Sequence, residues 1–218
     1  IVKSFVITIM DNPRSVEVAK RCIESGKKFG IEVEHHEGFT PKDNPEQMMI
    51  DKGIDYSKFK DSTYSRQEPC MAAFLSHREC WKKAIELDEP VLVLEHDAVF
   101  TAPIPKIDIP FKVISFGKPS YGAYRVSKKE GIFLMYSKPG GYMPGAHGYL
   151  VSPRGAKILV KKSYTHAEPT DIYLCNHNFP WICESYPWPI VADDSFSTIQ
   201  HEGGCVAKHN YKKGIDII

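Results

Sequence analysis

The sequence predicts an α/β fold, with a Rossmann-like, mostly parallel central sheet and helices on both faces. First, a β-branched run, Lys3 to Met10, precedes a stretch with helical spacing and then an alternating stretch, which is the order of a βαβ unit. Second, the clearest helix, residues 69–90, leads straight into the aliphatic run "VLVL", as expected for a central strand covered on both faces. Third, another strand and helix follow over residues 145–163.

The first half can be assigned element by element. The turn "DNP" separates the first strand from a helix over Ser15 to Phe29, and Gly30 closes that helix before a second strand in "IEVEHHEGF". Residues 40–68 are polar, with one short helix near Pro45 to Asp51. So long an excursion predicts either a lid or binding loop, or a packed irregular surface segment.

The second half begins at the helix over residues 69–90, whose apolar stripe ends before Pro90. After "VLVLEHDAVF", a proline-broken connection leads to a strand in "FKVISFG". Loops rich in glycine surround one more strand, "GIFLMY", before the strand and helix of residues 145–163. From Tyr164 the chain reads as an irregular C-terminal flank.

The composition predicts one ordinary globular domain over residues 1–218, with 42% hydrophobic and 25% charged residues. A formal net charge of +1 gives no electrostatic reason to expect a polyanionic partner. The chain has no apolar run long enough for stable membrane insertion, and its N-terminus meets acidic and turn residues too early to read as a secretory signal, although a leader removed before Ile1 stays an alternative. We therefore expect a cytoplasmic protein, bacterial or, if viral, in the host cytoplasm. The six cysteines form no C-x-x-C pair and are predicted to be reduced core thiols.

Two carboxylates stand at the end of the aliphatic strand. Glu95 and Asp97 lie where ligands bind in open parallel sheets. Residues i and i+2 of a strand point the same way, so both carboxylates are expected to converge on Mn²⁺ or Mg²⁺. Water molecules and phosphate oxygens would complete the coordination of that ion. His96 would point elsewhere or provide a nitrogen ligand. The alternative is that the carboxylates cap the next turn or form salt bridges.

Residues 74–100, "FLSHRECWKKAIELDEPVLVLEHDAVF", resemble the core signature of family 25 glycosyltransferases, which includes lipooligosaccharide and collagen hydroxylysine galactosyltransferases. The matching residues are Ser76, His77, Trp81, Leu92, Leu94, Glu95 and Asp97. The segments "SFVITIMDNPRS", "GYLVSPRGAKILV" and "EPTDIYL" resemble further parts of the family in the same order. Ala72 and Ala73 replace the family's Gly-Cys, and His96 replaces the central residue of its Glu-Asp-Asp triplet.

The resemblance implies a GT-A type fold, with a nucleotide-binding half over about residues 1–117 and an acceptor half over about 118–218. It implies transfer of a hexose from a nucleotide sugar, expected to be a UDP-sugar, to a hydroxyl acceptor with inversion. A divalent ion held by Asp97, with Glu95 nearby, would neutralise the charge of the departing diphosphate. His201 is the expected third ligand, with His209 as its rival.

Asp171 is the expected general base, because it matches the family's Pro-x-Asp segment. It could equally be an N-cap, and Asp193 and Asp194 are competing carboxylates.

The remaining candidates are assigned to the nucleotide sugar. His77, Glu95 and His96 are expected on its nucleotide side, and His77 could instead form a core pair with Trp81. His147, in the glycine-rich "PGAHGYL", could touch the donor sugar or the acceptor, although a tight turn explains the glycines equally well. Arg14 could meet a phosphate or uracil, or be a surface charge.

Two rival functions use the same residues. A metal-dependent phosphoesterase or nuclease would use Glu95, Asp97 and a histidine, and a non-catalytic sugar-binding domain would keep the fold without activity. The acceptor is a glycan, a protein hydroxyl or a hydroxymethylated base, and the sequence does not choose among them.

Overall fold

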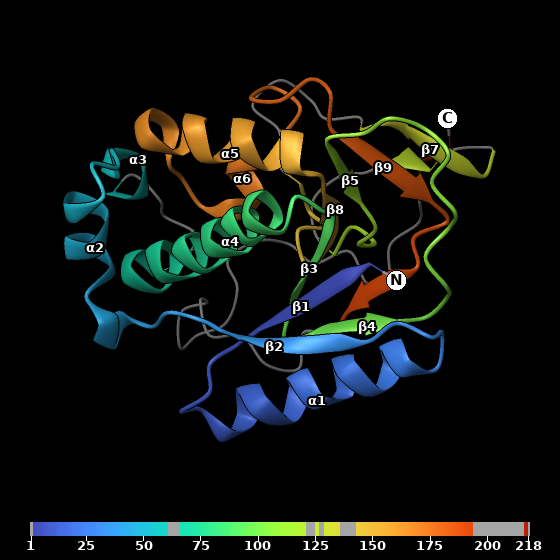
Figure 1. The fold of residues 1–218 in the computed structure, drawn as a ribbon, viewed down its shortest axis with the longest axis horizontal. Helices are drawn as coiled ribbons and strands as arrows, with labels where there is room; N and C mark the ends of the chain where they lie inside the picture. The colour runs from blue at the N-terminus through green and yellow to red at the C-terminus, as the bar shows by residue number, and fades with distance from the viewer. Residues whose placement is uncertain are drawn as a thin grey trace.

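A seven-stranded sheet forms the centre of the molecule, in the order β2-β1-β3-β8-β5-β9-β7 (Figure 1). The computed structural model describes residues 2–60, 66–120, 125–126, 129–135, 143–193 and 216–217. The strands of this sheet are β1 (Lys3–Thr8), β2 (Val33–Glu37), β3 (Val91–Glu95), β5 (Val113–Ser115), β7 (Gly131–Leu134), β8 (Gly148–Val151) and β9 (Cys183–Tyr186).

The sheet is mixed, with most strands running in one direction. β1 pairs in parallel with β2 and β3, and β5 pairs in parallel with β9. β8 is inserted antiparallel between β3 and β5, and β7 lies antiparallel beside β9 at the edge. Five of these seven strands therefore share one direction, which confirms the predicted mostly parallel α/β sheet.

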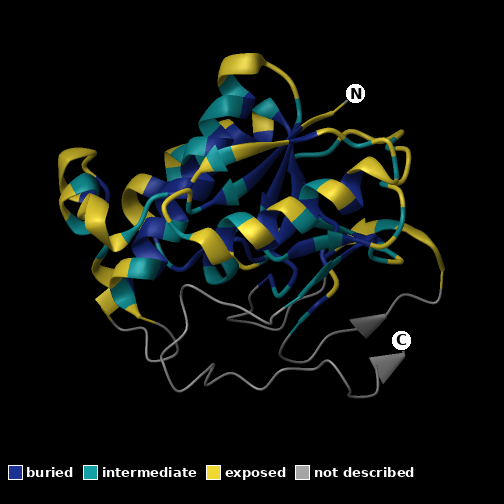
Figure 2. Ribbon diagram, turned by 90° about the horizontal axis from the view of Figure 1, so that it is seen from below, coloured by how far each residue is buried: buried dark blue, intermediate teal, exposed yellow. Residues whose placement is uncertain are grey.

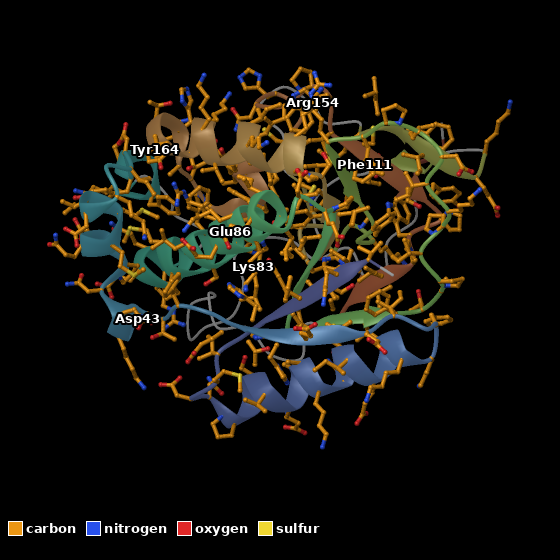
Figure 3. The ribbon with its side chains drawn as sticks, in the orientation of Figure 1. Asp43, Lys83, Glu86, Phe111, Arg154 and Tyr164 are labelled. Carbon is orange, nitrogen blue, oxygen red and sulfur yellow. The ribbon has the colours of Figure 1, made fainter. Side chains whose placement is uncertain are left out.

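Helices cover both faces of the sheet, as predicted. α1 (Pro13–Lys27) lies on one face, and α4 (Gln67–Leu87) and α5 (Pro153–His166) lie on the other (Figure 1). The aliphatic strand β3 shows why, because Val91 and Val93 join the core cluster of α4 and α5 while Leu92 and Leu94 join that of α1. Figure 2 shows the buried strands between helices whose outer sides are exposed, and Arg154 and Tyr164 lie on such an outer side of α5 (Figure 3).

The excursion after β2 is packed over its described part. It forms the short helices η1 (Pro41–Asp43), α2 (Pro45–Asp51) and α3 (Ser57–Lys60). Met49 and Phe59 are fully buried in the cluster of α4, and Ile54 is nearly so. Over residues 40–60 the structure therefore favours the packed surface segment over a lid.

The aliphatic strand predicted to carry both Glu95 and Asp97 at its end stops earlier in the structure. β3 ends at Glu95, His96 and Asp97 form a turn, and β4 (Ala98–Phe100) pairs antiparallel with β10 (Ile190–Ala192) in a separate two-stranded sheet. The i, i+2 geometry expected of Glu95 and Asp97 is therefore wrong. The pairing partner β10 lies about ninety residues downstream, so nothing local in the sequence indicates the break.

Three short elements complete the description. α6 (Thr170–Tyr173) follows α5, and β6 (Arg125–Val126) pairs in parallel with β11 (Asp216–Ile217). The five cysteines in the described ranges are free thiols, as predicted, and Cys205 lies outside those ranges. Among the helices of the described residues, none combines the length and the apolar character that a membrane crossing requires.

Candidate active site

Four predicted site residues meet at the carboxyl ends of β1 and β3. Glu95, the last residue of β3, pairs with Ile7 of β1. Because β8 runs antiparallel, its first residue lies beside Leu94, and the amide of Glu95 donates a hydrogen bond to the carbonyl of His147 (3.0 Å). The structure thereby brings Glu95 together with His77, His96 and His147, although these residues are up to seventy positions apart.

Glu95 is an ionised carboxylate surrounded by imidazoles. Its Oε1 lies 3.3 Å from Nε2 of His77, which is 1% exposed, while about a third of the Glu95 side chain (34%) remains accessible. Burial alone would raise the pKa of this carboxyl, but the hydrogen bond with His77 and the nearby His77, His147 and His96 rings shift it downward overall. A carboxylate that stays ionised and partly open suits a ligand that donates hydrogen bonds or carries positive charge.

His96 faces the start of α1. Its Nδ1 lies 2.9 Å from the hydroxyl oxygen of Ser15, which also accepts a hydrogen bond from the amide of Ile9 (3.0 Å). Burial lowers the pKa of His96, and the Glu95 charge opposes that shift only in part. His96 therefore links the turn after β3 to the β1–α1 connection, and Ser15 is a site residue that sequence reasoning missed.

Asp97 lies on the side of α1 and β10. Its carbonyl accepts a hydrogen bond from the amide of Asp193 (2.9 Å). Burial raises the pKa of the Cys22 thiol, and the charge of the Asp97 carboxylate raises it further. Asp193 in turn forms a salt bridge with Arg21 of α1. The carboxylates of Glu95 and Asp97 thus have different surroundings, because a turn separates the two residues.

His147 is held close to Glu95 by tightly packed backbone. It is 4% exposed, burial lowers its pKa, and its buried Nε2 has no hydrogen-bond partner among the described residues. A Cβ on Gly117 would lie 2.7 Å from that Nε2 and would also strike the backbone of Gly145. The glycine of "PGAHGYL" at position 145 therefore permits a close approach of two backbone segments.

Trp81 and Tyr149 lie behind His77 in the core. Both are fully buried, and the indole nitrogen of Trp81 donates to the Tyr149 hydroxyl (2.7 Å). The same hydroxyl lies 2.8 Å from Nδ1 of His77. His77 and Trp81 are therefore joined through Tyr149, so the core interpretation of Trp81 holds while His77 reaches the site. Sequence reasoning did not select Tyr149, because its partners are on a helix about seventy residues earlier.

Two other predicted residues, Arg14 and Asp171, stand outside this cluster. Arg14 is exposed at the start of α1 and pairs with Glu17 (3.0 Å), which matches the surface interpretation. Asp171 is in the first turn of α6, where its Oδ1 accepts from the amide of Ile172 (3.0 Å); the N-cap position itself is Pro169. The carbonyl of Asp171 accepts from the amide of Met143, at the start of the turn that carries His147.

A divalent metal would have oxygen donors at Glu95 and Asp97. Across the described residues, no group of three His, Cys, Asp or Glu side chains is arranged to hold a metal ion. Mg²⁺ and Mn²⁺ are commonly bound by one or two carboxylates with phosphate oxygens and water, so the partly accessible carboxylate of Glu95 is by itself a sufficient protein donor when a diphosphate completes the shell of the ion. The predicted third ligand, His201, lies outside the described residues, as do His209 and Asp194.

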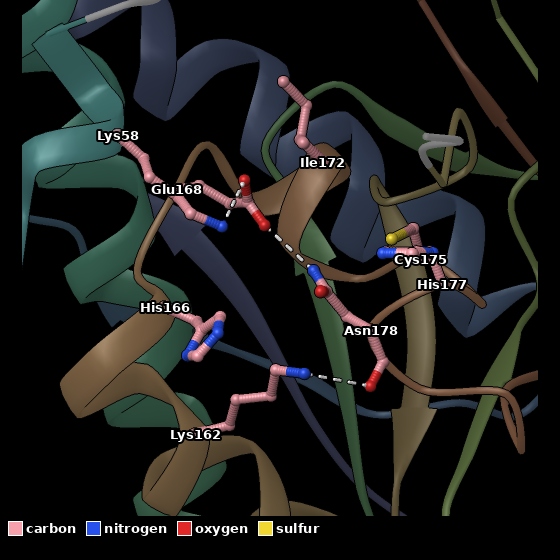
Figure 4. Close-up of a pocket in the computed structure, with 8 residues that line it drawn as sticks. All are labelled: Lys58, Lys162, His166, Glu168, Ile172, Cys175, His177 and Asn178. Atoms are coloured by element: carbon pink, nitrogen blue, oxygen red, sulfur yellow. Dashed lines mark hydrogen bonds and ion pairs between the residues drawn. The ribbon is translucent and has the colours of Figure 1, made fainter. Parts of the chain in front are cut away.

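A separate hollow of about 330 Å³ opens between α3, α5 and α6 (Figure 4). Its lining includes none of the predicted site residues: Lys58, Lys162, His166, Glu168, Ile172, Cys175, His177 and Asn178. Glu168 is bound by Lys58 (3.5 Å) and by the side-chain amide of Asn178 (2.9 Å), and Lys162 donates to the Asn178 carbonyl (3.3 Å). Several of its polar groups therefore bind one another.

One comparison with known proteins, the family model, agrees with the resemblance noted in the sequence. Residues 2–108 match the family model described as glycosyltransferase family 25 (LPS biosynthesis protein). No curated protein matches the chain in sequence. Among solved structures, the chain is similar to CTP:phosphocholine cytidylyltransferase from Streptococcus pneumoniae, with 15% identity, 89% of this chain and 94% of that chain covered, and a TM-score of 0.40. The match covers residues 2–108, which carry β1 to β4 and most of the Glu95 cluster, so the N-terminal part of the chain is similar to glycosyltransferase family 25.

Proposed function

We propose that the protein transfers a hexose from a UDP-sugar to an acceptor hydroxyl, with inversion and with the help of Mn²⁺ or Mg²⁺. The family match over residues 2–108 supports a glycosyltransferase. The observation that carries the finer proposal is the ionised, partly exposed Glu95 at the carboxyl edge of the sheet, ringed by three imidazoles. This is the edge at which nucleotides bind in open α/β sheets, and a GT-A type arrangement would place the donor there.

On the donor side, Glu95 would bind through the part of its carboxylate that remains accessible. Since Oε1 already accepts from His77, the other oxygen is the one offered to a ribose hydroxyl or to the metal. His96 holds the turn against α1, so that Asp97 follows at a fixed place. When bound between Asp97, Glu95 and the diphosphate, with His201 as the proposed third protein ligand, the metal ion would supply positive charge against the leaving group.

On the acceptor side, Asp171 would act as general base. The acceptor oxygen forms a bond to the anomeric carbon while that carbon's bond to the diphosphate oxygen breaks, and the electron pair leaves with UDP. The hydroxyl proton passes to the Asp171 carboxylate. The location supports this role, because Asp171 is hydrogen-bonded to the start of the turn that carries His147. His147 would contact the sugar or the acceptor through its buried, neutral ring.

The first experiment measures UDP release from a panel of UDP-sugars with and without Mn²⁺. Many transferases pass their sugar slowly to water, so we expect metal-dependent UDP release from one donor without any acceptor. Cleavage of simple phosphodiesters without release from any UDP-sugar would point instead to the phosphoesterase, and sugar binding without turnover to a non-catalytic domain. Thermal shift with each donor gives an independent measure of binding, since a bound ligand stabilises the folded state.

Two substitutions separate the proposed roles. Asp171→Asn should lower transfer by about 100-fold or more, as loss of a general base does, with an unchanged KM for the donor. Asp193→Asn is the matched control, because Asp193 is the rival carboxylate and is held by Arg21. Full transfer by Asp171→Asn would remove the base assignment. Asp97→Asn should abolish metal-dependent donor binding in calorimetry, and unchanged binding would remove the metal assignment.

A further inference from the structure

A continuous chain of hydrogen bonds runs from the core to Glu95. The indole nitrogen of Trp81 lies 2.7 Å from the Tyr149 hydroxyl, that hydroxyl lies 2.8 Å from Nδ1 of His77, and Nε2 of His77 lies 3.3 Å from Oε1 of Glu95. Trp81, Tyr149 and His77 are at most 1% exposed. The His77 ring also stacks on the Tyr149 ring, with an interplanar angle of 13°. Three elements, α4, β8 and β3, contribute to this chain.

The chemistry of the groups sets the direction of every hydrogen bond in the chain. An indole N–H can only donate, so the Tyr149 oxygen is an acceptor toward Trp81. Burial raises the pKa of Tyr149 well above its ordinary value, despite the opposing hydrogen bond from Trp81. Tyr149 therefore keeps its proton, and the chain directs that proton to Nδ1 of His77. With Nδ1 as acceptor, the ring proton of a neutral His77 is on Nε2, from which it is donated to Glu95.

The opposite arrangement leaves a buried proton without an acceptor within this chain. If Nδ1 of His77 carried a proton, it would face the Tyr149 hydroxyl, whose oxygen already accepts from Trp81. The tyrosine proton would then lose His77 as its acceptor inside a fully buried cluster. Leaving such a buried group unsatisfied is costly, because its desolvation is then not compensated. The geometry therefore favours one tautomer of His77.

We propose that Tyr149, supported by Trp81, is a positioning residue that holds His77 in its Nε2–H tautomer, so that the hydrogen bond from His77 fixes the orientation in which the Glu95 carboxylate meets the nucleotide sugar. This inference rests on the proposed function in assigning the donor to Glu95. Its consequence is that Oε1 of Glu95 stays on His77 while the second oxygen is directed to a hydroxyl or a cation of the donor complex. Tyr149 itself touches neither donor nor acceptor.

The tautomer can be measured in the protein without any substrate. In the ¹⁵N-histidine-labelled full chain at neutral pH, the ring nitrogens of His77 should show a protonated Nε2 and an unprotonated Nδ1. The signals are assigned by their loss in His77→Gln. A protonated Nδ1 in the wild-type chain would overturn the inference, and this measurement needs no variant at Tyr149.

Tyr149→Phe then tests the link to the reaction. The substitution keeps the ring that stacks on His77 and removes only the hydroxyl, so we expect Nδ1 to gain a proton in a substantial fraction of molecules. Loss of the partner that orients a metal-ligating histidine commonly costs about 10–100-fold in affinity or activity, and by analogy with such histidines we expect at least a tenfold rise in the KM for the donor. A variant with an unchanged tautomer and an unchanged KM would overturn the positioning role.

Tyr173→Phe is the matched control. Tyr173 is also fully buried, stacks on the same Trp81 and loses one hydrogen bond on substitution, since its hydroxyl donates to the carbonyl of Leu159. It has no such bond to His77, so the tautomer and the donor KM should not change. Equal effects of both substitutions on KM would mean a general core defect and would contradict the inference. If the wild-type protein releases UDP from none of the donors, the proposed function fails. The tautomer measurement still tests the hydrogen-bond chain from Trp81 to His77 in that case.

Discussion

Ser15→Ala tests whether His96 positions the turn that follows Glu95. The hydroxyl of Ser15 is fully buried, accepts from the amide of Ile9 (3.0 Å) and bonds Nδ1 of His96 (2.9 Å). The substitution removes both hydrogen bonds and leaves two polar groups without this partner. Because two hydrogen bonds of about 1–1.5 kcal/mol each are lost from a partly buried place, we expect the free energy of unfolding to fall by about 2–3 kcal/mol.

The assay combines stability with donor binding. For a chain of this length a loss of 1 kcal/mol lowers Tm by about 2–4 °C, so Ser15→Ala should melt about 4–12 °C below wild type. We also expect the KM for the donor to rise, because the turn between Glu95 and Asp97 loses its attachment to α1. Urea unfolding and the UDP-release assay measure the two effects.

Ser25→Ala is the control from the same helix. Ser25 donates to the carbonyl of Cys22 (2.8 Å) and accepts from the amide of Phe100 (3.0 Å), so it also ties α1 to the segment after β3 through two hydrogen bonds. It should lose similar stability while leaving the donor KM unchanged. A Ser15→Ala variant as stable as wild type, or one whose KM changes no more than that of Ser25→Ala, would refute the reasoning.

Three further predictions concern other parts of the molecule. Phe59→Ala should destabilise the fold by about 3–5 kcal/mol in urea unfolding, because this side chain is fully buried against α4; a loss below about 1 kcal/mol would revive the lid interpretation of residues 40–60. Gly117→Ala should cost about 1–3 kcal/mol by overpacking and raise the donor KM, since the new methyl group would strike the Gly145 backbone and Nε2 of His147; wild-type stability would argue against the close packing. Burial, followed by the charge of Lys83, lowers the pKa of His36, so the folded state binds fewer protons than the unfolded chain and stability should fall as the pH drops below about 6.5. That fall should be smaller in His36→Gln when unfolding is compared at pH 7.5 and 5.5, and an identical pH dependence would contradict the assignment.

Local patterns in the sequence were sufficient for most helices and strands, but not for their pairing. The continuous aliphatic run from Val91 to Leu94 correctly indicated a strand that is buried on both faces. The same apolar character resumes at Ala98, so the sequence does not show that the strand already ends at Glu95, and only the distant β10 explains why the chain leaves the sheet at His96. Likewise, nothing in a strand as short as β8 indicates that it runs antiparallel between β3 and β5.

In the candidate site, too, some residues could be predicted from the sequence and others could not. His77, Glu95, His96 and His147 were selected by residue type and resemblance, and they do meet. Ser15 and Tyr149 could not be selected, because each acts through a hydrogen bond to a residue more than seventy positions away. No spacing in the sequence distinguishes a serine or tyrosine whose buried hydroxyl positions a site residue from any other serine or tyrosine.

The place of β8 also bears on how a growing chain can reach this fold. β3 and β5 are complete by residue 115, yet they are not neighbours in the sheet, and each must wait for residues 148–151 to be paired on its open side. A nascent chain therefore carries unpaired strand edges through the synthesis of more than thirty further residues, and such edges invite aggregation. Pairings this distant in sequence also slow folding, so the sheet that places Glu95 is completed only after most of the chain exists.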